Sequence, residues 1–375
     1  MVKLAVWMNM PGHHQSGFYE ALRQRGVDLC VNYYGNVTQR RREQGWAGVR
    51  TLPAGERFVA PQIRELYATP DWHERVHIVP GYGSRFLRAL SAHLSVHRVP
   101  WMHWSERASG GLRWVLTYPL KAWYARRVNR NAVAALAIGE LTKLDFVRWG
   151  INPDKISILP YSGLLPPPAT EVDAQIADFA RDAAPLFLYV GALYPMKGVG
   201  LLIEAFASLA RAYPKARLAL VGRDESGGRY ARLLKKLGLS ERILLRGAIP
   251  FERLATALCA ADVLVQPSLY DGWGMTIAEA AGSGKALIAS DACGATAHLV
   301  RHGWNGFSVP AGDVVALVQA MQRYASDTQL ARLHGARSPK LYEEVTPERN
   351  AERFLNILLA RLGKSTDMGS SRGSK

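Results

Sequence analysis

Two acidic residues flank a glycine-rich stretch in the last third of the chain, in the sequence DGWGMTIAE from Asp271 to Glu279. A glycine-rich turn ahead of a helix presents backbone N–H groups without side-chain bulk, which suits a phosphate group. Carboxylates accept hydrogen bonds from hydroxyl groups and repel phosphates. The stretch is therefore a candidate ligand-binding site.

Each of these acids also has a purely structural interpretation. Thr276 and Glu279 have the spacing of a capping box, in which the glutamate only bonds back to the start of its own helix. Asp271 precedes a glycine, and both residue types are common in turns. The residues alone leave these alternatives open.

Two further charged residues each follow a short apolar run at a glycine-rich turn. Lys197 lies in GALYPMKG, residues 191–198, just ahead of an apolar helical pattern. A lysine beside a helix N-terminus forms a good anion site, although an ordinary exposed loop lysine has the same pattern. Arg223 lies in GRDESGG, directly after ARLALVG. Both are candidates for binding a negatively charged ligand.

Short apolar runs alternate with longer amphipathic stretches over most of the chain, which is typical of parallel sheets covered by helices on both faces. Three consecutive prolines, residues 166–168, interrupt this alternation, and it then restarts. We therefore predict two doubly wound, Rossmann-like α/β domains. The predicted parts are an N-terminal domain (1–165), a linker (166–184), a C-terminal domain (185–345), a helix capped by Thr346 (346–363) and a disordered tail (364–375).

The predicted strands of the first domain are VKLAVWM, VDLCVNYY, VHIVPGY, VPWMHW, VAALAIG and ISILPY, and those of the second are PLFLYVG, ARLALVG, ILLRGAI, DVLVQPS and KALIAS. In such sheets ligands bind beyond the carboxyl ends of the strands. The turns that follow the strands are therefore the places where site residues are expected.

Composition excludes several classes of protein. The chain has 375 residues, and its three cysteines, Cys30, Cys259 and Cys293, are far apart and fit neither a disulfide framework nor a cysteine-rich metal site. The apolar start of the chain is short and ends at Pro11–Gly12, so it is interpreted as a first strand and not as a signal peptide. No apolar run reaches the roughly 18 residues of a membrane span. These features favour a cytoplasmic location.

Positive charge is concentrated in the first half of the chain. The formal net charge is +16, of which residues 1–168 carry +11 (22 Lys and Arg, 11 Asp and Glu) and residues 169–375 carry +5 (25 and 20). Residues 112–130 interleave aromatic side chains such as Trp114 and Trp123 with several arginines. This pattern suits an anionic membrane surface, a lipid-diphosphate acceptor or single-stranded nucleic acid, and it also fits a core helix with arginines that reach to solvent.

The second half resembles the donor-binding domain of retaining GT-B glycosyltransferases of family 4, the glycosyl transferases group 1. Four motifs occur in the family's order: YVGALYPMKG, LALVG, VLVQPSLYDGWGMTIAEAAGSGKALIAS, and HLVRHGWNGFSVPAGDVVAL. The similarity covers roughly residues 186–320, and the first half matches only in outline. It implies a two-domain GT-B fold whose last helix packs back on the N-terminal domain.

The resemblance also implies roles for individual residues. In that family the second acid, here Glu279, binds the nucleotide ribose, and the first, here Asp271, contacts the transferred sugar. Lys197 would neutralise the phosphates. The remaining donor-binding candidates are Gly272, Trp273, Gly274, Met275, Thr276, Arg223, Gly191 and Gly12. Ala192 stands where the family commonly has a phosphate-binding arginine, and Asp271 stands where glutamate is commoner.

The N-terminal half should hold the acceptor. Family members often have a glycine-rich loop after the first strand, matched here by the loop that contains Gly12, and a histidine near the sugar after a later strand. His103 and Glu106, in WMHWSER, are the candidates for this catalytic position, and the sequence does not decide between them. A buried structural histidine is the alternative for His103. The adjacent His13 and His14 do not have the arrangement of a metal site.

The activity implied by the resemblance is transfer of a sugar, with retention, from a GDP- or UDP-sugar to a glycan or lipid-linked acceptor, as in bacterial surface polysaccharide synthesis. It implies no metal and no cofactor beyond the donor. We also expect peripheral contact with the inner face of an anionic membrane and no nucleic-acid partner. A nucleotide-sugar epimerase or phosphorylase of similar architecture is the alternative enzyme, and a basic nucleic-acid-binding protein is the alternative from another class.

Overall fold

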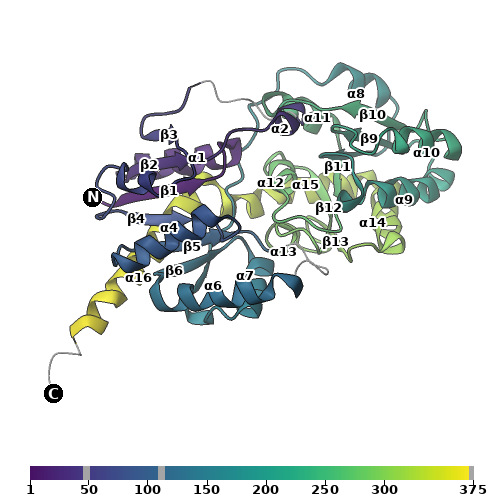
Figure 1. The fold of residues 1–375 in the computed structure, drawn as a ribbon. Helices are drawn as coiled ribbons and strands as arrows, with labels where there is room; N and C mark the ends of the chain where they lie inside the picture. The colour runs from purple at the N-terminus through teal and green to yellow at the C-terminus, as the bar shows by residue number, and fades with distance from the viewer. Residues whose placement is uncertain (45–50, 109–114, 371–375) are drawn as a thin grey trace. The chain divides into compact units, whose positions relative to one another are not determined.

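The computed structural model describes residues 1–44, 51–108 and 115–370, the last seven of these by their backbone alone. The chain divides into two compact units (Figure 1). Unit 1 comprises Met1–Val37, Val49–Ser162 and Thr346–Lys375, and unit 2 comprises Thr38–Gly48 and Gly163–Val345. Each unit contains one parallel sheet with helices packed around it, so the predicted fold class is confirmed.

Unit 1 contains a seven-stranded parallel sheet in the order β3-β2-β1-β4-β5-β6-β7. The strands are β1 (Lys3–Met8), β2 (Asp28–Tyr33), β3 (Glu56–Phe58), β4 (Val76–Val79), β5 (Trp101–Ser105), β6 (Ala134–Ala137) and β7 (Ile156–Ile158). All were predicted except the short β3, which has only three residues and no buried side chain. The order of the first six strands is the doubly wound arrangement that places ligands beyond the carboxyl ends of the strands.

The helices of unit 1 cover both faces of this sheet. They are α1 (His13–Gln24), α3 (Arg64–Tyr67), α4 (Arg85–Val96), α6 (Tyr118–Asn131), α7 (Glu140–Trp149) and α16 (Pro347–Ser370), with a 3₁₀ turn at Pro153–Lys155. The core beneath α4, α6 and α7 is rich in aromatic side chains, including Trp101, Tyr124, Phe146 and Trp149. Large rings bury much apolar area per residue, which suits a sheet with such short strands.

The C-terminal helix α16 packs on unit 1, as the resemblance implied. Its first turn is capped by Thr346, whose Oγ1 accepts from the Arg349 N–H at 3.2 Å. Phe354 and Leu358 are fully buried, and the Phe354 ring lies edge-on to Phe18 of α1, 6.1 Å between centroids. The helix does not end at Gly363 as predicted but continues to Ser370, so residues 364–370 of the predicted disordered tail are helical.

Unit 2 contains a six-stranded parallel sheet in the order β10-β9-β8-β11-β12-β13. The strands are β8 (Leu186–Val190), β9 (Arg217–Val221), β10 (Ile243–Gly247), β11 (Val263–Gln266), β12 (Ala286–Ser290) and β13 (Gly306–Val309). Its helices are α2 (Gln39–Glu43), α8 (Ala174–Phe179), α9 (Val199–Ala212), α10 (Arg229–Leu237), α11 (Leu254–Ala260), α12 (Met275–Gly282), α13 (Thr296–Leu299), α14 (Val314–Ser326) and α15 (Thr328–Tyr342), with 3₁₀ turns at Pro195–Lys197, Phe251–Arg253 and Glu343–Val345.

One boundary between the units falls between Ser162 and Gly163, three residues before the predicted linker of residues 166–184 begins. The predicted linker is not structureless, because it contains α8, which packs on β10 and α11. Asp173 caps α8 and forms an ion pair with Arg246 of β10, with 2.8 Å between Oδ2 and Nη2. The sequence could not show this pair, since its members are 73 residues apart.

Candidate functional site

The turn after β8 is the centre of the candidate site in unit 2. It runs from Gly191 through the 3₁₀ turn Pro195–Lys197 to Gly198, which is the N-cap of α9. Gly198 has φ +70°, and a Cβ there would collide with the carbonyl oxygen of Pro267, so only glycine fits. This close approach fastens the β8 turn to the segment that follows β11.

Backbone hydrogen bonds join three turns at the carboxyl edge of the unit 2 sheet. Leu193 N–H donates to the Arg223 carbonyl at 2.8 Å, which joins the turns after β8 and β9. Leu269 N–H donates to the Met196 carbonyl at 2.9 Å, which joins the turns after β8 and β11. The three predicted site segments are therefore held side by side, although up to 80 residues separate them in sequence.

Lys197 and Asp271 form an ion pair at this junction. The Lys197 Nζ lies 2.5 Å from the Asp271 Oδ2, and the side chains are only 19% and 15% exposed. Burial alone lowers the pKa of Lys197, but the charge and the hydrogen bond of Asp271 outweigh it and raise that pKa above its ordinary value. Lys197 is therefore a fixed positive charge at neutral pH.

The acid is held as firmly as the lysine. Asp271 N–H donates to the Ala292 carbonyl at 3.2 Å, and the Asp271 carbonyl accepts from Gly294 N–H at 3.3 Å. Gly294 packs so closely on the Gly272 carbonyl that no Cβ would fit there. The segment after β12, from Ala292 to Gly294, thus supports Asp271 from behind, and sequence reasoning gave it no role.

Helix α12 begins directly after the acid, with Gly274 as its N-cap at φ +95°. The first N–H groups of a helix have no partner within it, so this end can bind an anion. Trp273 is buried, with 2% exposure, and its ring packs against His298. Its side chain is thus a packing group, and only its backbone can face a ligand.

Glu279 lies in the middle of α12 with 4% of its surface exposed. The N-cap is Gly274, and Thr276, already inside the helix, donates its hydroxyl to the Val190 carbonyl at 3.3 Å. The capping-box interpretation is therefore wrong, because Thr276 is not the residue that begins the helix. Burial raises the pKa of Glu279 to about 8, far above the ordinary value of a glutamate.

Arg223 has a different environment from the one predicted. Its guanidinium forms an ion pair with Glu43 of α2, and Arg40 of α2 forms an ion pair with Glu225 of the same β9 turn, with 2.5 Å between Nη2 and Oε2. Arg223 still lies beside the position of the missing family arginine, because its carbonyl bonds to Leu193, the neighbour of Ala192. Sequence reasoning missed Arg40 and Glu225, since the chain places them 185 residues apart.

In unit 1 the structure places His103 in the core. The side chain is 0% exposed, and its ring nitrogens lie 3.0 Å from the Ser105 Oγ and 3.3 Å from the Tyr124 Oη. Phe146 and Trp149 pack around the ring. Burial lowers the pKa of His103 to about 3, so it is neutral at physiological pH. This environment favours the structural interpretation of His103.

Glu106 lies on the surface, directly after β5, at the carboxyl edge of the unit 1 sheet. Tyr161, which follows β7, forms a side-chain hydrogen bond with Glu106; burial first and this carboxylate second raise the pKa of Tyr161. The Tyr161 ring also lies edge-on to His14 of α1, 5.1 Å between centroids. Gly12, the N-cap of α1, belongs to the same edge. Of the two catalytic candidates, Glu106 is the one that a ligand can reach.

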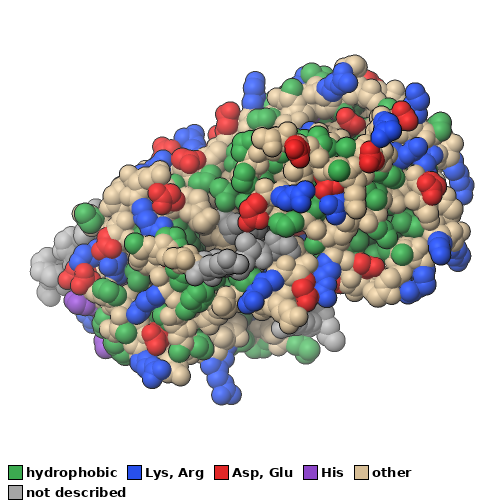
Figure 2. Space-filling model, turned by 90° about the horizontal axis from the view of Figure 1, so that it is seen from above, with side chains coloured by type: hydrophobic (Ala, Val, Ile, Leu, Met, Phe, Trp, Pro, Cys, Tyr) green, Lys and Arg blue, Asp and Glu red, His purple; other side chains and the backbone are tan. Residues whose placement is uncertain are grey.

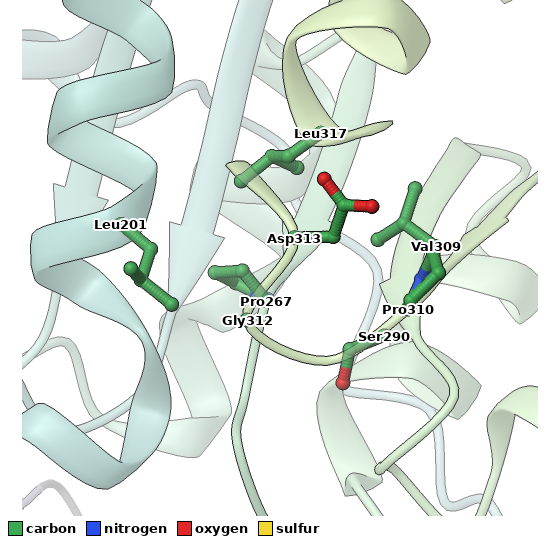
Figure 3. A pocket seen from close by; sticks show the side chains of 8 residues that line it. All are labelled: Leu201, Pro267, Ser290, Val309, Pro310, Gly312, Asp313 and Leu317. Carbon is green, nitrogen blue, oxygen red and sulfur yellow. The ribbon is translucent and has the colours of Figure 1, made fainter. Parts of the chain in front are cut away.

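A small pocket in unit 2 lies beyond the ends of β11, β12 and β13 (Figure 3). Figure 3 shows Leu201 on one side of it, Val309 and Pro310 on the other, and Asp313 between them. Asp313 serves as the N-cap of α14, accepting from Ala316 N–H at 2.9 Å, and Ser290 donates to the Ser268 carbonyl. The lining contains none of the predicted site residues.

Within residues 1–44, 51–108 and 115–370, no group of three or more His, Cys, Asp or Glu side chains is arranged to hold a metal ion. Among the same residues, no helix has both the length and the apolar character to cross a bilayer. The predicted basic and aromatic segment 112–130 is partly covered by the structure, because Arg113 and Trp114 lie outside the described residues. Lys and Arg side chains are spread over the face seen in Figure 2, among fewer acids.

Most of unit 2 is similar in sequence to a known family. Residues 173–340, somewhat less than half of the chain, match the sequence model of the glycosyl transferases group 1. The match covers the β8 turn, the β9 turn and the whole stretch from Asp271 to Glu279. The resemblance drawn from the four motifs is thereby confirmed.

Characterised relatives carry related names. The chain is 26% identical over 220 residues to the alpha-D-kanosaminyltransferase of Streptomyces kanamyceticus, an alignment that covers 57% of each chain. It is 30% identical over 210 residues to the phosphatidyl-myo-inositol mannosyltransferase of Mycobacterium leprae, covering 54% of this chain and 51% of that protein. The matched segments thus span about half the length of these relatives.

The similarity in fold extends over nearly the whole chain. HepE of Anabaena, solved in complex with UDP, superposes with a TM-score of 0.74 over 96% of this chain and 100% of that one, at 16% identity. Sucrose-phosphate synthase of Thermosynechococcus elongatus gives a TM-score of 0.72 at 19% identity. At such identities the comparison establishes a shared GT-B fold.

Proposed function

We propose that this protein is a retaining glycosyltransferase that moves a sugar from a UDP- or GDP-sugar to a hydroxyl group of a glycan or lipid-linked acceptor. The observation that supports the proposal is the largely buried Lys197–Asp271 ion pair beside the N-terminus of α12. The buried Glu279 lies on the same helix, four residues after its first residue, Met275. This one edge of the sheet offers a cation and backbone N–H groups to a diphosphate and carboxylates to the hydroxyl groups on either side of it.

The parts of the donor are assigned by charge. The diphosphate lies against the α12 N-terminus and Lys197, where positive charge is fixed. Glu279 accepts hydrogen bonds from the ribose hydroxyls, and Asp271 accepts from the transferred sugar. Solved relatives of the same fold support the donor class, because HepE has been solved with UDP and with UDP-glucose.

The reaction needs no nucleophile from the protein. The acceptor oxygen forms its bond to the anomeric carbon on the face from which the diphosphate departs, so the configuration is retained. The proton of the acceptor hydroxyl passes to the departing phosphate oxygen. Negative charge grows on that phosphate as the glycosidic bond breaks, and Lys197 stabilises it, so the proposal requires no metal ion.

Unit 1 supplies the acceptor site in this proposal. Glu106 is placed at the carboxyl edge of its sheet and is held by Tyr161, so it can accept a hydrogen bond from an acceptor hydroxyl. A lipid-linked acceptor would bring the protein to the cytoplasmic face of a membrane. The alternatives of an epimerase, a phosphorylase or a nucleic-acid-binding protein explain neither the paired Lys197 and Asp271 nor the match to a transferase family.

Calorimetric titration with UDP, GDP and ADP tests the donor assignment. One of these nucleotides should bind with micromolar affinity, and adding EDTA should leave that affinity unchanged. The matching nucleotide sugar should then be turned over, and the anomeric configuration of the product, read by NMR, should equal that of the donor. Absence of binding to all three nucleotides, together with salt-sensitive binding to nucleic acid, would favour the nucleic-acid alternative.

A further inference from the structure

Unit 1 exposes a set of apolar side chains on two neighbouring helices. On and just before α6 these are Val115, Leu116, Leu120 and Trp123, with exposures of 61%, 71%, 36% and 44%. On α7 they are Leu144 and Val147, with 54% and 43%. We call these six residues the apolar face. Single exposed apolar residues are common, but a group of six on adjoining helices marks an interaction surface.

Most of these exposed side chains belong to regular helices and not to loops. Leu120 and Trp123 lie three residues apart on α6, which places them along one side of that helix, and Leu116 lies two residues before its start. The opposite side of α6 is buried, with Tyr124, Ala125 and Val128 in the core of unit 1. Helix α7 packs against α6, and the two lie side by side in Figure 1.

Positive charge predominates on the helices of the apolar face. Helix α6 contains no Asp or Glu between Tyr118 and Asn131, and its exposed cations are Arg126 and Arg130. Helix α7 adds the exposed Arg148. The guanidinium of Arg127 lies over the Trp123 ring, 4.4 Å from its centroid, which joins the apolar and the basic parts.

The acids of α7 do not offset these cations. Asp145 is buried and accepts from Ala108 N–H, and Glu140 forms an ion pair with Lys143, 3.6 Å between Oε2 and Nζ. The face therefore presents apolar side chains bordered by positive charge, which complements the headgroups and upper acyl chains of an anionic bilayer.

We propose that the apolar face of α6 and α7 docks on an anionic membrane, with Leu116, Leu120 and Trp123 inserted at the level of the headgroups. Five of the six side chains are aliphatic, and aliphatic groups gain from entering lipid but give no stacking surface to bases. This distinguishes a bilayer from single-stranded nucleic acid, the other partner that the basic and aromatic pattern of the sequence allowed.

The docking face is physically joined to the candidate acceptor residue. Ala108 follows Glu106 by two residues, and its N–H donates to the Asp145 carboxylate of α7 at 2.8 Å. Docking through α7 would therefore hold the segment that carries Glu106 close to the lipid surface. This last step rests on the proposed function, since it gives Glu106 a lipid-linked acceptor, whereas the docking itself does not.

Co-sedimentation with vesicles tests the docking. The full chain should bind vesicles of phosphatidylcholine with 30% phosphatidylglycerol, a composition on the order of that of anionic membranes, and bind pure phosphatidylcholine weakly. The triple variant Leu116→Ser, Leu120→Ser, Trp123→Ser should reduce binding more than tenfold. Replacing Arg126, Arg130 and Arg148 by Gln should cost about fivefold for each cation that lies near the surface.

The matched controls are Val315→Ser and Leu333→Ser, which alter equally exposed apolar residues of unit 2 and should leave vesicle binding unchanged. Nucleotide affinity, measured in parallel, shows whether each variant is folded, and it separates a failure of docking from a failure of the proposed function. Equal binding of wild type and triple variant to anionic vesicles would overturn the proposal. So would a change from dimer to monomer in the triple variant without loss of vesicle binding, since the face would then bind a second copy.

Discussion

The two parallel sheets have similar strands, but the side chains at their carboxyl edges are arranged very differently. In unit 2 the charged residues that follow β8 and β11 are drawn together into a buried ion pair, and backbone bonds join three successive turns. In unit 1 the histidine of β5, His103, is enclosed by Tyr124, Phe146 and Trp149, whereas Glu106 and Tyr161 lie at the edge. A Rossmann-like sheet therefore fixes where a site can lie, but the turns decide whether one is built there.

The two candidate sites also differ in the buried titratable groups that lie nearest to them. Unit 1 buries histidines in neutral form, with burial lowering the pKa of His103 to about 3 and that of His77 to about 4. Unit 2 buries a carboxyl group, and burial raises the pKa of Glu279 to about 8. Buried neutral histidines serve packing, whereas a buried carboxyl in the helix that we propose binds the donor is a group whose charge a ligand can change.

The largest expected effect comes from removing the cation of unit 2. Lys197→Ala should lower turnover by about 10²–10³-fold, because the lysine stabilises charge that grows on the leaving phosphate. Donor affinity should fall much less, since the ground-state diphosphate keeps its contacts with α12. Steady-state kinetics with Lys236→Ala, an exposed lysine of α10, as the control would check this. A loss confined to the Michaelis constant would contradict the proposed role.

In unit 1, we expect substitution of the buried His103 to lower stability. His103→Ala should cost about 2–4 kcal/mol in the free energy of unfolding, because it leaves a cavity among aromatic rings and two hydrogen-bonding groups without a partner. Nucleotide affinity should stay the same. Urea unfolding and calorimetric titration of the same variant make the measurement. A folded variant of wild-type stability with no turnover would restore His103 as a catalytic residue.

Because His103 and His77 are buried in neutral form, we expect the protein to lose stability in acid. Unfolded histidine takes up a proton near pH 6.5, whereas folded His103 and His77 do so only near pH 3 and 4. As the pH falls through this window the unfolded state binds more protons, so the free energy of unfolding decreases. Thermal unfolding of His103→Ala between pH 7 and 4 should show a shallower decline than that of the wild type. Parallel declines would mean that His103 does not contribute.

The contribution of Glu279 to stability should depend on pH in the opposite direction. Its folded pKa of about 8 exceeds its ordinary value of 4.5, so the wild type loses stability as the pH rises from about 4.5 to 8. Glu279→Gln removes that titration and should be the more stable protein at pH 8, by an amount on the order of a few kcal/mol, and no more stable at pH 4.5. Thermal unfolding at the two pH values measures the difference. A variant that is less stable at both would contradict the assigned burial.

Glu279→Gln should at the same time weaken nucleotide binding by roughly 1.5–3 kcal/mol, since a charge-assisted hydrogen bond to the ribose is lost. Wild-type affinity should rise as the pH approaches 8, because the ribose prefers the ionised carboxylate, and the variant should lack this dependence. A nucleotide sugar is the suitable probe, since its diphosphate does not titrate in this range. Asp271→Asn is the matched variant and should bind the free nucleotide nearly normally while losing turnover.

The sequence predicted most of the fold because its strands are short apolar runs separated by glycine-rich turns, a pattern that local physics determines. It predicted Lys197 and Asp271 as members of one site, since both follow strands of one parallel sheet. It could not predict their direct pairing, the ion pairs of α2 with the β9 turn, or the environment of His103. These depend on contacts between residues that are 74, 180 and 21 positions apart. The length of the turns, which periodicity does not encode, determines such contacts.

The smallest expected effect is a change in nucleotide affinity on substitution of Arg223, at the carboxyl edge of the unit 2 sheet. Ala192 occupies the place in the β8 turn where the resemblance implied an arginine, and Arg223 of the adjoining β9 turn is fixed beside that position by the bond from Leu193. In the structure Arg223 pairs with Glu43, and both side chains are about two-fifths exposed, 41% and 38%, so that ion pair contributes little to stability. A diphosphate can therefore take the place of Glu43 at modest cost.

Arg223→Ala should weaken UDP or GDP binding by about 0.5–1 kcal/mol and leave binding of the bare nucleoside unchanged. Glu43→Gln, which frees Arg223, should strengthen diphosphate binding by a similar amount. Equal losses for nucleoside and nucleotide in Arg223→Ala would mean that Arg223 only supports the turn, and the phosphate would then depend on Lys197 and α12 alone.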